Sequence, residues 1–115
     1  MHELAIANSV LDLVRKEAQL RPGARVTKIC MRVGDLAGLD SDAFTFCFEA
    51  LIKDTDLSSV TLEIERKPQR HRCPRCGNQF SVIDYETACS FCGEEQTIFI
   101  SGDELEVACL EMEES

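Results

Sequence analysis

Four cysteines in two matching pairs constrain the fold of this chain more than any other feature. Each pair has the pattern Cys-x-x-Cys-Gly, at residues 73–77 and 89–93. Two cysteines three residues apart can point both sulfurs at one ion, and the following glycine permits the positive φ that turns backbone N–H groups toward the thiolates. Two such pairs close a tetrahedron of four sulfurs, which is the geometry of a structural zinc site with no open position.

The predicted ligands of this zinc site are Cys73, Cys76, Cys89 and Cys92. Iron is one alternative, because rubredoxin-like sites hold it with the same paired pattern and ligand softness does not separate the two metals. Rubredoxins are much shorter chains, which favours zinc here. Redox-active or disulfide-linked use of the four cysteines is the other alternative. The segment around them has almost no apolar core, so we expect the metal to supply its folding energy.

The other three cysteines, Cys30, Cys47 and Cys109, are scattered among apolar neighbours. We expect each of them to be a small buried core side chain. The N-terminus lacks a basic region followed by an apolar run, so no secretory signal is expected. Seven cysteines in such a chain favour metal binding over disulfides and a cytoplasmic location, where thiols are kept reduced.

Hydrophobic periodicity predicts an α+β fold around the cysteine segment. The predicted helices are residues 3–20 and a second helix that begins with Asp40 or Ser41 as its N-cap; the predicted strands are residues 25–33, 60–65, 97–100 and 105–109. The apolar stripe of the first helix is Leu4, Ala7, Leu11, Val14 and Ala18. The acidic tail from Glu111 onward is expected to fray.

The predicted fold class is therefore α+β, with a small mixed sheet, two helices and an inserted zinc-ribbon-like domain with four cysteines. The insert is expected to cover residues 69–94. Residues 1–68 and 95–115 are expected to form the main α/β domain.

Charge and composition exclude several classes of function. Twelve basic and 21 acidic residues give a formal net charge of −9, which repels nucleic acid phosphates and anionic membrane surfaces. No stretch approaches the roughly 18 apolar residues that a membrane span needs. No nucleophile–base pair or glycine-rich phosphate loop is visible, so we do not expect an enzyme.

The first three residues, Met1-His2-Glu3, form a candidate second metal site. The α-amine of Met1, the next backbone amide and the His2 imidazole can close a five-membered and a six-membered chelate ring on one ion. Three nitrogens in a plane suit tetragonal Ni(II) or Cu(II) better than tetrahedral Zn(II), and Glu3 can add a carboxylate. The alternative is a mobile terminus that binds nothing. The apolar helical stripe that begins at Leu4 favours the metal site, because we expect it to hold the terminus against the core.

Together these features resemble the HypA/HybF family of nickel-insertion proteins for [NiFe]-hydrogenase. The resemblance covers essentially the whole chain and rests on the Met1-His2-Glu3-Leu4 start, the Val33-Gly34 strand end, the phenylalanine-rich helix at 44–48 and the paired cysteine motifs. It implies a metallochaperone that delivers Ni(II) to the hydrogenase large-subunit precursor together with a HypB-type GTPase. In some organisms the same protein also serves urease maturation.

The resemblance also implies site residues. Nickel falls on the Met1 amine, His2 and Glu3, and structural zinc on the four cysteines. Asp40 matches a position near nickel in some relatives, but it also suits a helix N-cap, and both interpretations stay open. The chain departs from relatives that place His directly after each cysteine pair, because it has Gly77 and Gly93 there. A constant four-cysteine site is therefore expected.

Two features leave alternatives open. His71 lies two residues before the first cysteine pair, and we expect it to be exposed and incidental rather than a hydrogen-bond donor to the site. The cysteine segment also carries basic and aromatic residues, namely Arg70, Arg72, Arg75, Phe80, Tyr85 and Phe91. They would suit a zinc-ribbon interaction or transcription-type module with no nickel role, although the remainder of the chain is too acidic for nucleic acid.

Overall fold

The computed structural model describes residues 2–114 and divides them into two compact units. The first unit contains the residues up to Arg32, then Leu39–Glu65, and the residues from Glu106 onward. The second unit contains Val33–Gly38 and Arg66–Leu105. The sequence predicts a zinc-binding insert at residues 69–94 and a main domain made of residues 1–68 and 95–115. These domain limits stay a prediction.

The expected α+β order is observed, with two further short strands around the first cysteine pair. The elements are α1 (Glu3–Gln19), β1 (Ala24–Gly34), the 3-10 helix η1 (Asp35–Ala37), α2 (Ser41–Ile52), β2 (Thr61–Lys67), β3 (Arg70–Arg72), β4 (Gln79–Ser81), β5 (Ile98–Ser101) and β6 (Leu105–Glu114). Neither helix is long and apolar enough to cross a membrane.

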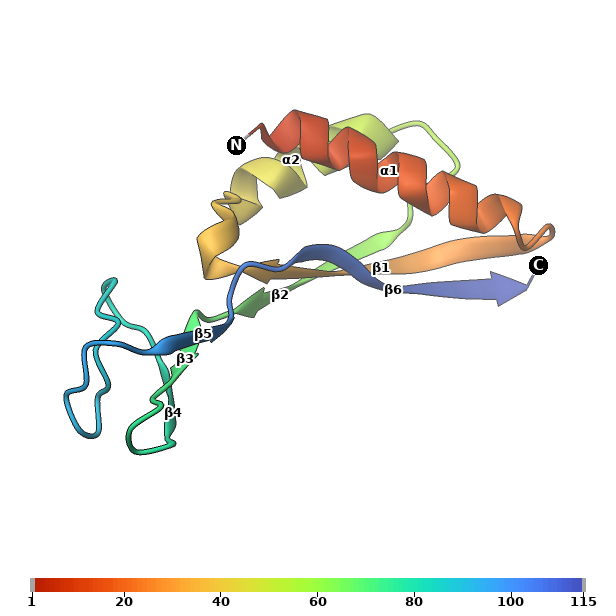
Figure 1. Ribbon diagram of the computed structural model, residues 1–115. Coiled ribbons are helices and arrows are strands. Elements are labelled where there is room, and N and C mark those ends of the chain that lie inside the picture. The colour runs from red at the N-terminus through yellow and green to blue at the C-terminus, as the bar shows by residue number, and fades with distance from the viewer. Residues whose placement is uncertain (1, 115) are drawn as a thin grey trace. The chain divides into compact units, whose positions relative to one another are not determined.

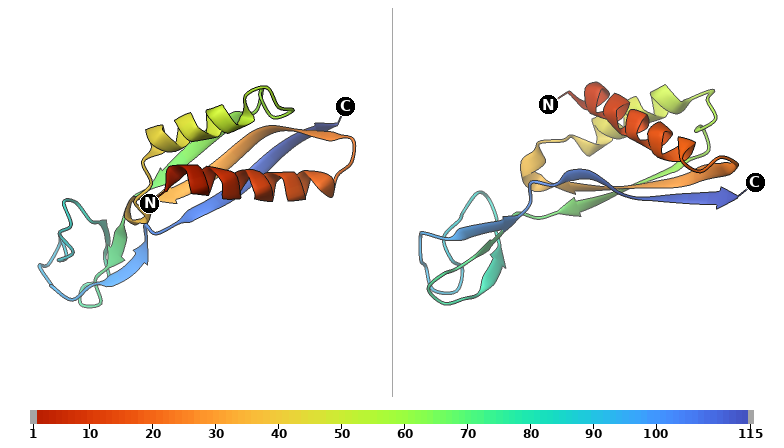
Figure 2. Two further views of the ribbon diagram at one scale, coloured as in Figure 1. Left: turned by 90° about the horizontal axis from the view of Figure 1, so that it is seen from above. Right: turned by 45° about the vertical axis from the view of Figure 1, so that its right-hand side comes forward.

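The first unit is a three-stranded sheet with both helices on one face (Figures 1 and 2). The strand order is β2-β1-β6, so β1 is central and β6 is an edge strand. The arrows of β1 and β2 point the same way in Figure 1 and that of β6 points the opposite way, which makes the sheet mixed. Helix α2 is the crossover between the two parallel strands, as a parallel connection requires.

The core of the first unit lies between the sheet and the helices. Ile29 and Met31 point into it from β1, as their alternation predicts, and Phe44 and Phe48 fill it from α2. From α1 the buried residues are Ala7, Val10, Leu11 and Val14. Leu4 is 49% exposed, so its predicted place in the core is wrong. The buried stripe of α1 begins one turn later, at Ala7.

In the second unit, β3 lies between β4 and β5 and pairs antiparallel with both. His71 of β3 is opposite Phe80 of β4 and Phe99 of β5. A register shift between Arg70 and His71 interrupts the pairing with β5. The short strand predicted at 97–100 is therefore β5, and its partner β3 belongs to the segment just before the cysteines.

Two glycines make a close backbone approach in the second unit. A Cβ on Gly34 would lie 2.1 Å from the carbonyl oxygen of Gly102, and a Cβ on Gly102 would lie 2.5 Å from the Cα of Gln69. The N–H of Gly34 donates to the Glu104 carbonyl at 2.7 Å, and the N–H of Leu36 donates to the Gly102 carbonyl at 2.8 Å. Only residues without a side chain permit this contact.

Two expectations about the last strand are wrong. Cys30 of β1 and Cys109 of β6 form a disulfide, and Cys109 is exposed rather than buried. The sequence places both residues among apolar neighbours but does not show that adjacent strands bring them together. The acidic tail does not fray within the described residues, because β6 continues to Glu114. In this part of the strand Glu113 pairs with Arg25 of β1.

Candidate metal centres

The two cysteine pairs form two loops with the same hydrogen bonds. In the first loop the N–H of Cys73 donates to the Asn78 carbonyl and the N–H of Gly77 donates to the Cys73 carbonyl, at 2.9 and 2.8 Å. In the second loop Cys89 and Gly93 repeat the pattern at 2.8 and 2.9 Å, with Glu94 as the acceptor of the first bond. Both glycines have a positive φ, 79° and 82°, which is the left-handed conformation that glycine adopts without strain.

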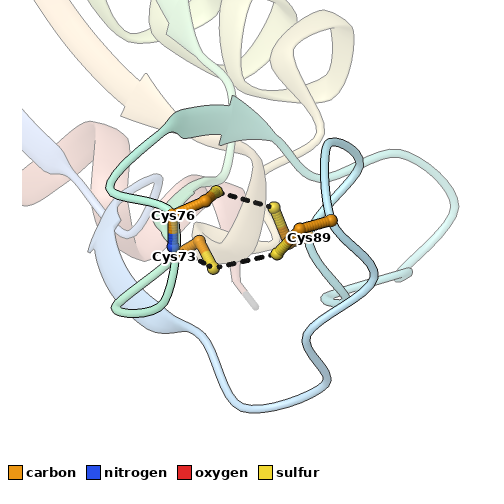
Figure 3. A group of neighbouring side chains, drawn as sticks. Cys73, Cys76 and Cys89 are labelled. Carbon is orange, nitrogen blue, oxygen red and sulfur yellow. Dashed lines mark hydrogen bonds between the residues drawn. The ribbon is translucent and has the colours of Figure 1, made fainter.

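The two loops face each other and bring four sulfurs together (Figure 3). The sulfurs of Cys73, Cys76, Cys89 and Cys92 all lie within 4.8 Å of one another. The closest pairs, Cys73 with Cys92 and Cys76 with Cys89, are 3.6 Å apart. A tetrahedral ion with Zn–S distances of about 2.3 Å needs sulfurs roughly 3.8 Å apart. The cluster therefore fits a four-coordinate zinc ion, as the sequence predicts, and these residues are the ones that would hold it.

Backbone and side-chain N–H groups of the loops point at the sulfurs. The N–H of Cys76 donates to the Cys73 sulfur at 3.5 Å, and the N–H of Phe91 donates to the Cys89 sulfur at 3.4 Å. The side-chain amide of Asn78 donates to the Cys76 sulfur at 3.4 Å. Such donors stabilise thiolate charge and orient the sulfurs toward the ion.

Without a cation, the pKa values of Cys76 and Cys92 are shifted in opposite directions. Hydrogen bonds from Asn78, first from its backbone, lower the pKa of Cys76 to about 6. At Cys92 the backbone of Glu94 lowers the pKa, but burial and the three neighbouring sulfurs outweigh it and raise the pKa to about 12. Since like charges so close repel, four thiolates need a cation between them. A divalent ion supplies that charge, and its binding releases the remaining protons.

His71 is a structural part of this unit, contrary to the expectation that it is exposed. Its side chain is buried, and its ring makes an edge contact with Phe99 at 5.8 Å between centroids. The Thr97 hydroxyl donates to the Thr87 carbonyl at 2.6 Å and therefore accepts from Nδ1–H of His71, 2.9 Å away. Nε2 then accepts from the Gln69 amide at 3.0 Å. The ring joins β3 to the segment after the second cysteine loop, and no sequence pattern indicates this.

The candidate nickel site involves the first residues of α1 and α2. Met1 lies outside the described residues, so the structure describes His2, Glu3 and Asp40 only. His2 is the N-cap of α1 with an extended backbone, and its side chain makes no capping hydrogen bond. The Glu3 carboxylate accepts the backbone N–H of Asp40 at 3.2 Å. The start of α1 therefore contacts the start of α2, and His2 is exposed.

Asp40 is the N-cap of α2, as predicted from the sequence. Its carboxylate accepts the N–H of Ala43 at 3.1 Å, and its backbone is extended with φ −79° and ψ 107°. One oxygen of this carboxylate is thus used by the helix, and its second oxygen remains a possible donor to a nearby ion. The positive ends of both helix dipoles stabilise the carboxylates gathered here.

Comparisons with known proteins agree with this combination of features. The family model described as "Hydrogenase/urease nickel incorporation, metallochaperone, hypA" matches residues 1–112. The "Hydrogenase maturation factor HypA" of Geobacter metallireducens is 42% identical over 113 residues, which cover 98% of this chain and 100% of that protein. The "Hydrogenase maturation factor HybF" of Klebsiella pneumoniae is 34% identical over the same shares.

Solved structures agree on the fold. The solution structure of the Ni metallochaperone HypA from Helicobacter pylori superposes with a TM-score of 0.66 at 20% identity and covers all of both chains. None of these comparisons supports a zinc-ribbon or transcription-type module without a nickel role. The full-length family match, the relatives above 30% identity and the four-sulfur cluster lead to one conclusion: the chain belongs to the HypA/HybF family of nickel metallochaperones for hydrogenase maturation.

Proposed function

We propose that this chain binds Ni(II) through the Met1 amine, the His2 imidazole and Glu3, and delivers it for insertion into a hydrogenase. The observation that carries the proposal is the contact between Glu3 and Asp40, which holds the start of α1 against the start of α2. The His2 imidazole is exposed and directly precedes Glu3 at the start of α1. Nitrogen donors from the terminus with a carboxylate suit Ni(II) in tetragonal geometry.

The start of α1 restricts the chelating residues. The His2 carbonyl accepts the N–H of Ile6 at 3.1 Å, so the first helical turn of α1 begins at the residue that carries the imidazole. The ring is free of capping bonds and open to solvent. An exposed site with few protein ligands allows handover by ligand substitution. Release of nickel requires a moderate affinity. A micromolar Kd corresponds to a binding free energy of about −8 kcal/mol.

Calorimetric nickel titration of the untagged, zinc-loaded chain tests this assignment. The His2→Ala variant and a chain with an added N-terminal dipeptide should both lose nickel binding, because each removes one nitrogen of the chelate. Zinc should stay at one ion per chain in both. The variant Asp42→Asn is the matched control, since it removes an acidic residue in the first turn of α2 that is not in the Glu3 contact. Unchanged nickel affinity in the extended chain would contradict the proposal.

The recipient and the helper are part of the same proposal. Membership of this family places the chain in the maturation of hydrogenase. We infer that a large-subunit precursor receives the nickel and that a HypB-type GTPase assists, and that urease maturation proteins are served where they occur. We place this function in the cytoplasm and assign no catalysis to the chain. A purified precursor should gain nickel from the loaded wild-type chain and not from His2→Ala; equal transfer from both would contradict delivery through this site.

A further inference from the structure

The edge strand β6 borders a groove that neither metal centre uses. Among the residues that the structure describes, β1 is the one strand paired with β6 in its sheet. An edge strand presents backbone N–H and C=O groups with which another extended segment can pair. We propose that this edge, together with the groove beside it, binds an extended segment of a partner protein in which basic and apolar residues alternate. This interface is separate from nickel binding and from the zinc site.

The groove lies beside β6 and not over the centre of the sheet. Its lining comes from α1 and the turn after it and from β6, and from no described residue of the central strand β1; the lining residues are Leu13, Glu17, Arg21, Val107, Cys109, Leu110 and Met112. Its volume is about 630 Å³, within the range of roughly 300–1,000 Å³ of ligand sites. In the left view of Figure 2, α1 runs along the β6 side of the sheet and α2 along the β2 side. A strand added next to β6 would therefore place one of its faces against α1.

Apolar side chains in the groove are incompletely covered. Leu13 of α1 is 45% exposed, and Val107, Leu110 and Met112 of β6 are each half-buried. When a strand is added to a sheet edge, backbone hydrogen bonds give affinity, and contacts with every second side chain give specificity. Because successive side chains of a strand point to opposite faces, apolar residues at alternate positions of the incoming segment would bury this surface.

The other face of β6 carries carboxylates. Glu111 and Glu113 alternate with two groove residues of the same strand, so their side chains project from the opposite face. Glu106 pairs at 3.1 Å with Arg32, which follows the core residue Met31 in β1 and therefore lies on that opposite face as well. Opposite charges on neighbouring strands stabilise their pairing. Basic side chains at the remaining alternate positions of the segment would meet these glutamates.

The same carboxylates disfavour a second copy of this chain as the occupant. β6 contains four glutamates and no lysine or arginine, so antiparallel pairing of two β6 strands would gather like charges on one face. The formal net charge of −9 adds repulsion between two copies. A segment rich in lysine or arginine reverses both effects. Charged residues on an edge strand hinder its pairing with itself, and here they leave the edge available to a basic partner.

The edge is held in place before a partner arrives. The disulfide between Cys30 and Cys109 joins the middle of β6 to β1, and the pair of Arg25 with Glu113 joins the two strands again near the end of β6. A binding surface that is already ordered loses less conformational entropy on association. The incoming segment is then the main part that must become ordered.

An NMR titration of the zinc-loaded chain with a synthetic peptide provides the test. The probe is an end-blocked peptide of alternating lysine and valine, about nine residues long, which is within the usual length of a strand. Amide shifts should change along β6 and around Leu13 and Glu17 and stay unchanged in α2 and β2. The matched control peptide carries N-methyl groups on all interior residues, which removes its backbone donors but keeps its charge. It should bind roughly tenfold more weakly. Equal affinity for both peptides, or shifts spread over other acidic surfaces, overturns the proposal, because either result means electrostatic association without strand pairing.

The groove and the chemistry of the partner are tested separately. Leu13→Ala should weaken binding of the lysine–valine peptide about fivefold, as expected when one half-exposed leucine no longer contributes apolar area. Leu4→Ala is the matched control, because Leu4 is 49% exposed on the same helix but does not line the groove, and it should leave the affinity unchanged. A peptide with glutamate in place of lysine should not bind. Equal losses in the two variants, or equal binding of the glutamate peptide, overturns the assignment. Self-association of the chain that is lost in Leu13→Ala would make a second copy the occupant and would also overturn it.

Discussion

The two units of this chain are held together by different interactions. In the first unit large apolar side chains such as Phe44, Phe48 and Ile29 are completely buried. In the second unit, the buried cluster found among residues 2–114 around the metal end is Cys73, Phe80 and Cys89, with Val82 packed against it, and two of these are candidate ligands. Many large apolar residues of the segment 66–105 are exposed, namely Ile83, Tyr85, Phe91, Ile98, Phe99, Ile100 and Leu105. Hydrophobic burial therefore stabilises the first unit, whereas the second depends on its metal and on a few polar contacts.

Removal of zinc should break this comparison most visibly. A structural zinc ion contributes on the order of 10 kcal/mol to the folding of a small domain, and the second unit has little else to replace it. Treatment with a strong chelator should abolish amide protection for residues 70–100 and leave that of α1 and β1 intact. Hydrogen exchange followed by NMR measures both regions in one sample. Retained protection in the cysteine loops without metal would contradict the assignment of zinc as the main stabilising element.

Truncation of a buried phenylalanine should affect the first unit alone. Phe48→Ala removes a completely buried ring and should lower the free energy of unfolding of that unit by roughly 3–5 kcal/mol. Phe46→Ala is the matched control on the same helix, because its ring is 74% exposed, and a change within about 0.5 kcal/mol is expected. Urea denaturation gives both values. Similar losses for the two variants would contradict the assigned core, and zinc content should stay unchanged in each.

Glycine-to-alanine changes should separate close contact from backbone conformation in the second unit. Gly102 has φ 122° and no room for a Cβ, so Gly102→Ala combines strain with a clash and should cost roughly 2–3 kcal/mol. Gly38 has φ 71° but open space around it, so Gly38→Ala should cost only about 1 kcal/mol. Thermal unfolding of the zinc-loaded protein compares them. Equal losses of stability in the two variants would mean that the backbone contact between Gly102 and Gln69 adjusts to the added Cβ without a further loss of stability.

The sequence predicts the elements of the first unit well, because that unit is built from periodic burial. Alternation locates Ile29 and Met31 in the core, and the N-cap preference locates the start of α2 at Asp40. The sequence predicts the zinc ligands equally well, since two identical motifs and their glycines specify the two loops locally. These features depend on residues within about one turn or one strand of each other, where local chemistry decides conformation.

What the sequence does not reveal depends on contacts between distant residues. Prediction of the Cys30–Cys109 disulfide requires the knowledge that β6 lies beside β1. The apolar neighbours of the two cysteines predict a buried position for both, which is wrong. The hydrogen bonds of His71 reach residue 97, far along the chain. The short strands β3 and β4 have three residues each, too few for a period to be visible. Glycine contacts such as that of Gly34 with Gly102 carry no local signal either.

The smallest predicted effect concerns Asp40, whose two interpretations can be separated. Asp40→Ala removes the acceptor for the Ala43 N–H and should destabilise the first unit by about 1 kcal/mol. Asp40→Asn keeps an acceptor oxygen, and asparagine caps helices about as well as aspartate, so stability should be unchanged. The charge is lost in both variants. If Asp40 also supplies a carboxylate to nickel, both variants weaken nickel binding while only Asp40→Ala loses stability. If it is a cap alone, nickel affinity in Asp40→Asn stays at the wild-type value, and the metal site is then limited to the first three residues.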